Sequence, residues 1–144
     1  MNKYNSNNFK ETISFIQQVF ELCNGRINLT KKPKELRIIF HSNQTAYISN
    51  KGIFYFNITA IQYMNDTSKT MILDIIAHEL SHLDQNVDYN RYKNDKEYYK
   101  YIESTNIERT YNFIIENKNS FEKLLGFNID MNYMNTIKNL YTKQ

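Results

Sequence analysis

The first part of the chain carries apolar residues at helical spacing. Residues 8–23 place hydrophobic side chains three or four positions apart, which is typical of an amphipathic helix. The dipeptide Asn24-Gly25 follows directly and supplies a stop signal. The sequence therefore predicts a first helix that ends near residue 23.

The next part of the chain changes to strand-like patterning. Three short β-rich runs occupy residues 36–41, 45–49 and 53–58. The last two are joined by Asn50-Lys51-Gly52, a short polar link with a glycine that indicates a hairpin. We therefore expect a small antiparallel sheet of about three strands.

Helical spacing returns over residues 68–85. Ser68 has the residue type that favours a helix N-cap. The apolar positions that follow share one face of the predicted helix and indicate packing against a core. They are Ile72, Ile76, Leu80 and Leu83.

The remainder of the chain predicts further helices. A polar segment at 86–96 favours a loop, a helical pattern follows at 97–117, and a last helix is expected near residues 131–141. No internal repeat or long linker interrupts the sequence. These elements predict one α+β domain over residues 1–144, with the small sheet packed on helices.

Composition narrows the possible partners. The formal net charge is +3 and the charges are dispersed, so no basic surface for nucleic acid is expected. No segment approaches the roughly 18 apolar residues of a membrane span. Cys23 is the only cysteine and the first residues are polar, which favours a cytoplasmic protein. The abundance of Asn, Lys, Ile and Tyr is typical of a low-GC bacterium or its phage.

The central helix carries the pattern His78-Glu79-Leu80-Ser81-His82. Two histidines four residues apart lie on the same helical face, where both imidazoles can bind one Zn²⁺ at about 2.0–2.1 Å. Glu79 lies one residue round the helix and can reach a zinc-bound water without being a ligand. The spacing therefore predicts His78 and His82 as metal ligands and Glu79 as the catalytic general base.

Two nearby titratable residues have less defined roles. Asp74 lies one turn before His78, where it either accepts the free ring N–H of that histidine or occupies a solvated helix position. His41 stands alone on a predicted strand, and we expect an ordinary partly buried histidine there rather than a ligand.

A catalytic zinc site needs a third protein ligand and one open position. No histidine follows His82, so the third ligand is expected to be a carboxylate on the next helix. Two candidates fit a loop and a returning helix: Glu103 and Glu108, which lie 21 and 26 residues after His82. Because they are five residues apart they face different directions, and only one is expected to bind.

The motif, followed by Glu108-Arg109-Thr110-Tyr111-Asn112, resembles the gluzincin metallopeptidases. It is nearest to the short ImmA/IrrE-like and phage-encoded forms, over about residues 53–115. Their second helix typically contains Glu-x-Glu-Ala-Asn/Asp-x-Phe, from which Thr110, Tyr111 and Ile114 depart. The resemblance implies that Glu108 is the third zinc ligand and that Asn112 supports the site by hydrogen bonding. The spacing of Glu103 is more like that of thermolysin-type enzymes.

The resemblance also implies a zincin-like fold and a way to bind substrate. In gluzincins an edge strand beside the motif helix pairs with the substrate backbone, and residues 53–58 are expected to take this role. A tyrosine or histidine near the developing oxyanion is also expected. The candidates are Tyr98, Tyr99, Tyr101 and His41.

The predicted activity is zinc-dependent endopeptidase hydrolysis of a protein substrate, with Glu79 activating the zinc-bound water. One alternative is a catalytically silent zincin-fold module that serves as a binding or regulatory partner. A second alternative is a structural protein of phage origin with a chance match. An intact Glu79 favours the peptidase, because a purely structural zinc needs no general base.

Overall fold

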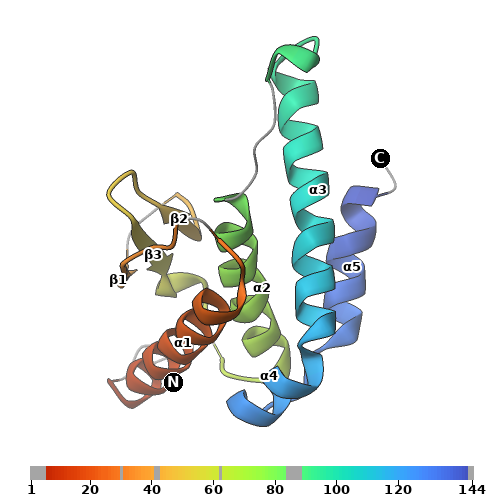
Figure 1. The fold of residues 1–144 in the computed structure, drawn as a ribbon. Helices are drawn as coiled ribbons and strands as arrows, with labels where there is room; N and C mark the ends of the chain where they lie inside the picture. The colour runs from red at the N-terminus through yellow and green to blue at the C-terminus, as the bar shows by residue number, and fades with distance from the viewer. Residues whose placement is uncertain (1–5, 30, 41–42, 62, 84–88, 143–144) are drawn as a thin grey trace.

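Helix α2 (Asp66–His82) lies at the centre of the computed structural model, which describes residues 6–29, 31–40, 43–61, 63–83 and 89–142. The sheet and α1 lie on one side of α2, and α3 and α5 lie on the other (Figure 1). The remaining elements are α1 (Ser6–Arg26), β1 (Glu35–Ile39), β2 (Ala46–Ile48), β3 (Ile53–Asn57), η1 (Ile58–Ala60), η2 (Tyr89–Arg91), α3 (Asp95–Glu116), α4 (Lys118–Leu125) and α5 (Met131–Thr142).

The predicted first helix is confirmed as α1, with its apolar face against α2. The predicted stop at Asn24-Gly25 is wrong, because α1 continues through both residues to Arg26. Ile16, Val19 and Cys23 recur at helical spacing along this face, and all three are fully buried. Burial raises the pKa of the Cys23 thiol far above its ordinary value, so this cysteine stays protonated and acts as a packing residue.

The three predicted strands are present, but their pairing is mixed rather than purely antiparallel. Strand β3 pairs antiparallel with β2 across a tight turn in which Gly52 adopts a positive φ of 80°. Its other edge pairs parallel with β1, which gives the order β1-β3-β2. The chain between β1 and β2 carries no hairpin signal, and β2 returns on the far side of β3.

The pairing order corrects the role expected for residues 53–58. Strand β3 is the middle strand and pairs on both sides, so neither of its edges is open. Its Phe54 and Phe56 side chains are fully buried. The edge strand that contacts α2 is β2, which begins at Ala46.

Helix α2 begins two residues earlier than predicted. Asn65 is the N-cap, because its side-chain oxygen accepts a hydrogen bond from the backbone N–H of Ser68 at 2.8 Å. The expected cap, Ser68, is therefore inside the helix. At the other end α2 stops at His82, and Leu83 lies past it with 38% of its surface exposed.

The apolar stripe of α2 is otherwise confirmed and is wider than predicted. Its fully buried side chains meet α1 and the sheet on one side and reach α3 on the other. A helix that is apolar over so much of its surface must lie inside the protein. These side chains are Ile72, Leu73, Ile76, Ala77 and Leu80.

The helices expected at 97–117 and 131–141 are confirmed as α3 and α5. Helix α4, which lies between them, was not predicted. Gly126 ends α4 in the left-handed conformation, with a φ of 72°. One continuous hydrophobic core includes side chains from α1, the sheet and α2 to α5. The fold class is α+β, and none of the helices in the described ranges is long and apolar enough to cross a membrane.

The corrected helix start predicts a difference between two alanine variants. Asn65→Ala removes the side-chain acceptor at the N-cap and should lower the free energy of unfolding by about 1 kcal/mol. Ser68→Ala leaves the backbone donor in place and should change it by less than about 0.5 kcal/mol. Urea denaturation followed by circular dichroism measures both. A larger loss in Ser68→Ala than in Asn65→Ala would contradict the assignment.

Candidate metal centre and adjoining pocket

The two motif histidines lie on the last turns of α2 and face the same way. Their Nε2 atoms are 3.1 Å apart, and the ring planes are nearly perpendicular at a centroid distance of 4.7 Å. Both side chains are mostly buried, with 19% of His78 and 26% of His82 exposed. The helix therefore presents two ring nitrogens to one point, as the sequence predicts.

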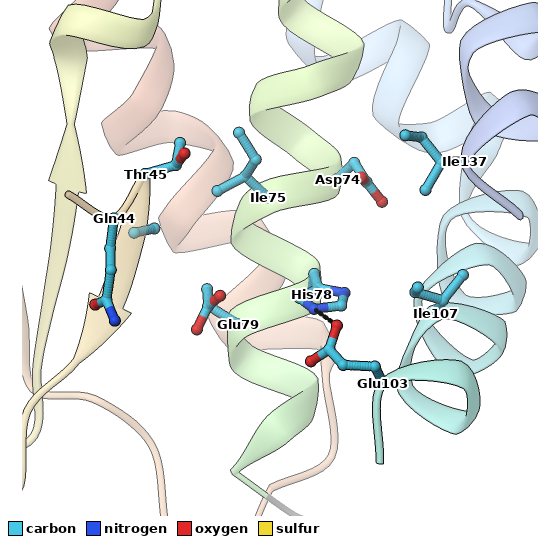
Figure 2. Close-up of a pocket in the computed structure, with 10 residues that line it drawn as sticks. Gln44, Thr45, Asp74, Ile75, His78, Glu79, Glu103, Ile107 and Ile137 are labelled. Atoms are coloured by element: carbon cyan, nitrogen blue, oxygen red, sulfur yellow. Dashed lines mark ion pairs between the residues drawn. The ribbon is translucent and has the colours of Figure 1, made fainter. Parts of the chain in front are cut away.

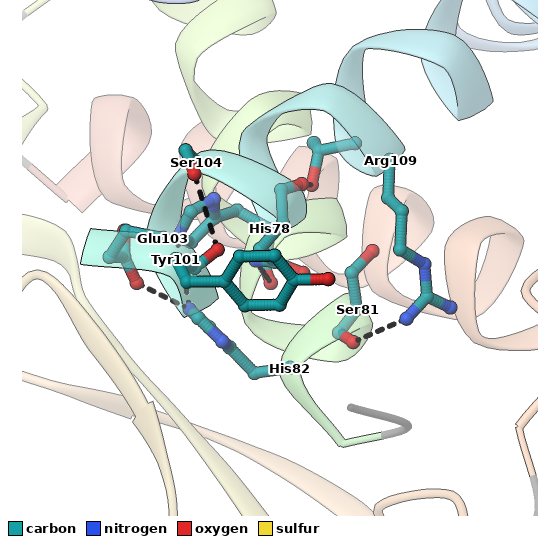
Figure 3. A network of polar contacts seen from close by, with 9 residues as sticks. His78, Ser81, His82, Tyr101, Glu103, Ser104 and Arg109 are labelled. Atoms are coloured by element: carbon teal, nitrogen blue, oxygen red, sulfur yellow. Dashed lines mark hydrogen bonds and ion pairs between the residues drawn. The ribbon is translucent and has the colours of Figure 1, made fainter. Parts of the chain in front are cut away.

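A carboxylate from α3 completes the cluster, and it belongs to Glu103. Its two oxygens lie 2.8 Å from His82 Nε2 and 3.3 Å from His78 Nε2. Figure 3 shows Glu103 reaching from α3 to the end of α2. The three side chains form a group whose possible ligand atoms all lie within 4.8 Å of one another.

The structure thus corrects the preference for Glu108 over Glu103. The face of α3 that meets α2 carries Asn106 and Thr110, both buried, and Glu103 precedes Asn106 by about one turn on that face. Glu108 is rotated by roughly 140° from Glu103 and is exposed. Asn112, expected to support the site, is exposed as well. The part of the ImmA/IrrE-like resemblance that depends on Glu108 and Asn112 loses its support.

Polar contacts hold α3 in register against the histidine-bearing turns. The side-chain amide of Asn106, fully buried, donates a hydrogen bond of 2.8 Å to the backbone carbonyl of His78. Thr110 donates to the Asn106 carbonyl, and Arg109 reaches the Ser81 carbonyl at 3.5 Å (Figure 3). Because Asn106 is three residues from Glu103, this bond fixes where the Glu103 carboxylate meets the histidines.

The cluster fits a zinc ion in both chemistry and size. Two imidazoles and one carboxylate are a common donor set for catalytic zinc. Ligand atoms about 2.05 Å from a tetrahedral ion are separated from one another by about 3.3–3.4 Å. The separations of 3.1, 3.3 and 2.8 Å in this cluster are close to that value. Small side-chain shifts would accommodate the ion and leave a fourth position open.

The pKa values of Glu103 and Glu79 are shifted in opposite directions. Hydrogen bonds from His78 and His82 hold the pKa of Glu103 well below its ordinary value, so this carboxylate is ionised and ready to bind a cation. For Glu79 burial dominates and raises the pKa, with both histidines acting in the opposite direction. A carboxylate with a raised pKa accepts and releases protons more readily near neutral pH.

A pocket of about 420 Å³ adjoins the cluster and extends to both sides of His78. Figure 2 shows Gln44, Thr45 and Glu79 on the side of the sheet, and Asp74 with two isoleucines on the side of α3 and α5. Side chains from the sheet side, from α2, and from α3 and α5 therefore all line the pocket. Its lining residues are Gln44, Thr45, Ala46, Asp74, Ile75, His78, Glu79, Glu103, Ile107 and Ile137.

Asp74 lines this pocket and is not a solvated helix position. Burial raises its pKa to about 6, although the nearby His78 acts to lower it. Asp74 in turn raises the pKa of Tyr133 on α5, adding to the effect of burial there. The carboxylate therefore lies between α2 and α5, where its charge is poorly solvated.

None of the tyrosines considered for the oxyanion lines the pocket. Tyr99 is 62% exposed and Tyr101 is 45% exposed, and the Tyr98 ring contacts the Tyr92 ring edge-to-face at a centroid distance of 5.8 Å. His41 lies outside the described residues. The structure therefore gives none of these three tyrosines a place in the pocket lining.

No protein-family model matches the sequence, and comparisons with curated proteins and with solved structures gave no match either. The functional argument therefore depends on the site itself.

The two glutamates of α3 should differ sharply in their effect on zinc binding. Glu103→Gln removes a charged ligand and should weaken zinc affinity by more than the roughly 10–100-fold typical of supporting groups. Glu108→Gln, on the exposed face of the same helix, should change it less than about twofold. Competition with a chromophoric chelator gives both affinities. Equal zinc binding by Glu103→Gln and the wild type would remove Glu103 from the ligand set.

Asp74 predicts a pH-dependent stability difference in metal-free protein. Because its pKa is higher when folded, at about 6, than the ordinary 3.8, the folded state binds more protons at Asp74 between these values. The cost of the buried charge therefore grows as pH rises from about 4 to 6 and is constant above. Asp74→Asn should be more stable than wild type by up to about 3 kcal/mol at pH 7 and nearly equal at pH 4. Urea unfolding with a chelator present measures this, and a pH-independent difference would contradict it.

Proposed function

We propose that this chain is a zinc-dependent endopeptidase. The observation that carries the proposal is the convergence of His78, His82 and Glu103 at separations that suit a tetrahedral zinc ion. Glu79 lies in the same pocket as His78 and has the raised pKa of a general base. The HExxH spacing and a carboxylate from the following helix agree with gluzincin chemistry in general.

The metal and Glu79 supply complementary chemistry in this proposal. When bound by His78, His82 and Glu103, a zinc ion makes a water easier to deprotonate and polarises the scissile carbonyl. Glu79 accepts the proton of the attacking water as the carbon–oxygen bond forms. The same carboxyl then donates that proton to the leaving amine as the peptide bond breaks, so the general base returns to its starting state.

The edge of β2 is the proposed binding surface for the substrate backbone. Within the described strands the outer edge of β2 has no partner, and β2 contacts α2. Gln44, Thr45 and Ala46 at its start line the pocket beside Glu79. An extended peptide that adds to this edge gains main-chain hydrogen bonds whatever its sequence. Because the pocket continues past His78 towards α5, the peptide can extend beyond the scissile bond, as an endopeptidase requires.

The alternative function is a catalytically silent binding module, which the Glu79→Gln experiment described next distinguishes from a peptidase. Such a module would bind zinc and a peptide but would have no use for Glu79 as a base. Its position in the pocket, together with its raised pKa, therefore favours catalysis over binding alone.

The decisive variant is Glu79→Gln. The amide keeps the size of the side chain but cannot take a proton, so cleavage should fall by several orders of magnitude while zinc content stays at one ion per chain. Mass spectrometry of a lysate-derived peptide library, incubated with wild type or variant, measures cleavage, and elemental analysis measures zinc. Cleavage by Glu79→Gln at the wild-type rate would exclude the mechanism. Stoichiometric zinc without cleavage by the wild type would favour the binding module.

A further inference from the structure

The pocket beside the metal centre is locally acidic in a chain that is basic overall. Three of its lining residues are carboxylic acids, Asp74, Glu79 and Glu103, and the ten described lining residues include no lysine or arginine. The whole chain carries a formal charge of +3, so this acidity is a property of the pocket and not of the composition. A cationic group is therefore favoured inside it.

Two of the three carboxylates have tasks in the proposed reaction, and Asp74 has none. Glu103 faces the histidines and Glu79 faces the sheet, whereas Asp74 lies one helical turn before His78 towards α5 (Figure 2). On this side the pocket wall is formed by Ile107 of α3 and Ile137 of α5. An acid in a pocket beside two isoleucines is uncommon, because burying its charge costs free energy.

We propose that this part of the pocket binds the side chain of a lysine or arginine that flanks the scissile bond. The aliphatic stem packs between Ile107 and Ile137, and the cationic head pairs with Asp74. The inference rests on the proposed peptidase function and names its substrate class: peptides with a basic residue next to the cleaved bond. Long basic side chains suit such a site, since they bury an apolar stem and keep a charged head for a polar partner.

The dimensions of the site agree with this occupant. Asp74 and His78 are four residues apart, which corresponds to about 6 Å along the helix axis. A side chain attached to backbone near His78 must span about this length, which the four-carbon stem of lysine can do. Shorter polar side chains cannot reach Asp74, and an acidic side chain would be repelled by it.

Within the described part of the chain, α5 contributes no lysine or arginine to the pocket lining around Asp74. Lys138, which follows Ile137 in the sequence, places its ammonium over the Tyr111 ring at 4.2 Å from the ring centroid. Tyr111 belongs to α3, and Lys138 is not among the residues that line the pocket. The Asp74 carboxylate is therefore available to a cation brought by the substrate.

The first experiment asks which peptides the zinc-loaded wild-type protein cleaves. A suitable probe is a lysate digested by an endoprotease that cuts after glutamate, because lysine and arginine then remain inside the peptides. Lysine and arginine together should be enriched about tenfold or more at one position flanking the cleavage sites. Cleavage that depends on Glu79 but shows no such enrichment would overturn the inference and leave the peptidase function intact. Absence of any Glu79-dependent cleavage would overturn both.

The second experiment isolates the cationic head. One cleaved peptide is synthesised with lysine at the enriched position and again with norleucine, which keeps the stem and lacks the ammonium. The wild type should prefer lysine by about tenfold or more in kcat/KM. In Asp74→Asn the preference should fall to about one. Ile137→Ala should slow cleavage of both peptides, because the wall that holds the stem is shortened.

The ratio of kcat/KM for the lysine and norleucine peptides distinguishes recognition of the substrate cation by Asp74 from a role of Asp74 in supporting His78. A supporting role would lower zinc affinity and slow both peptides equally, so the lysine preference would persist in Asp74→Asn and overturn the inference. Glu108→Gln is the matched control, since it also removes one carboxylate charge but from the exposed face of α3. It should keep the wild-type preference. Circular dichroism and zinc content confirm that each variant is folded and loaded.

Discussion

The contact between α2 and α3 is the interaction on which the site depends. Helix α2 alone places two imidazoles at one point, but two ligands do not make a catalytic metal site. The Glu103 carboxylate lies beside the histidines where the buried Asn106 amide bonds to the His78 carbonyl and Ile107 is buried on α3. A rotation of α3 by one residue, about 100°, would carry the Glu103 carboxylate away from the histidines.

The burial of apolar side chains in the core offsets the free-energy cost of this polar cluster. Five fully buried side chains of α2 pack into a core shared with α1, the sheet and the later helices. Burying each large one stabilises the fold by roughly 1.5–3 kcal/mol. That gain offsets the cost of keeping ionisable groups half buried on the opposite face, where burial raises the pKa of both Glu79 and Asp74.

Local patterns in the sequence predicted most of the elements and the placement of the two histidines on one helical face, because these depend on periodicities of 3.6 and 2 residues. They did not predict α4 or the ends of α1 and α2. The strand pairing was predicted only in part, since periodicity is silent about which strands are neighbours and β1 joins β3 from a distance. The choice between Glu103 and Glu108 failed for a similar reason. It required knowing which face of α3 is buried, and that face is marked by Asn106 and Thr110, two polar residues that hydrophobic patterning does not detect.

The three carboxylic acids of this pocket have different surroundings and therefore different chemical properties. Two imidazole hydrogen bonds keep Glu103 ionised, so it suits a cation that stays bound. For Glu79 the effect of burial on the pKa outweighs the opposite effect of the two histidines, so its pKa is raised. A raised pKa suits a group that must take up and release a proton. Asp74 has apolar neighbours on α3 and α5 and no task with the metal, and a buried charge of this kind is retained at a cost. Under the proposed peptidase function, a cationic side chain of the substrate would offset that cost while it is bound, and the burial of Asp74 would then favour basic peptides.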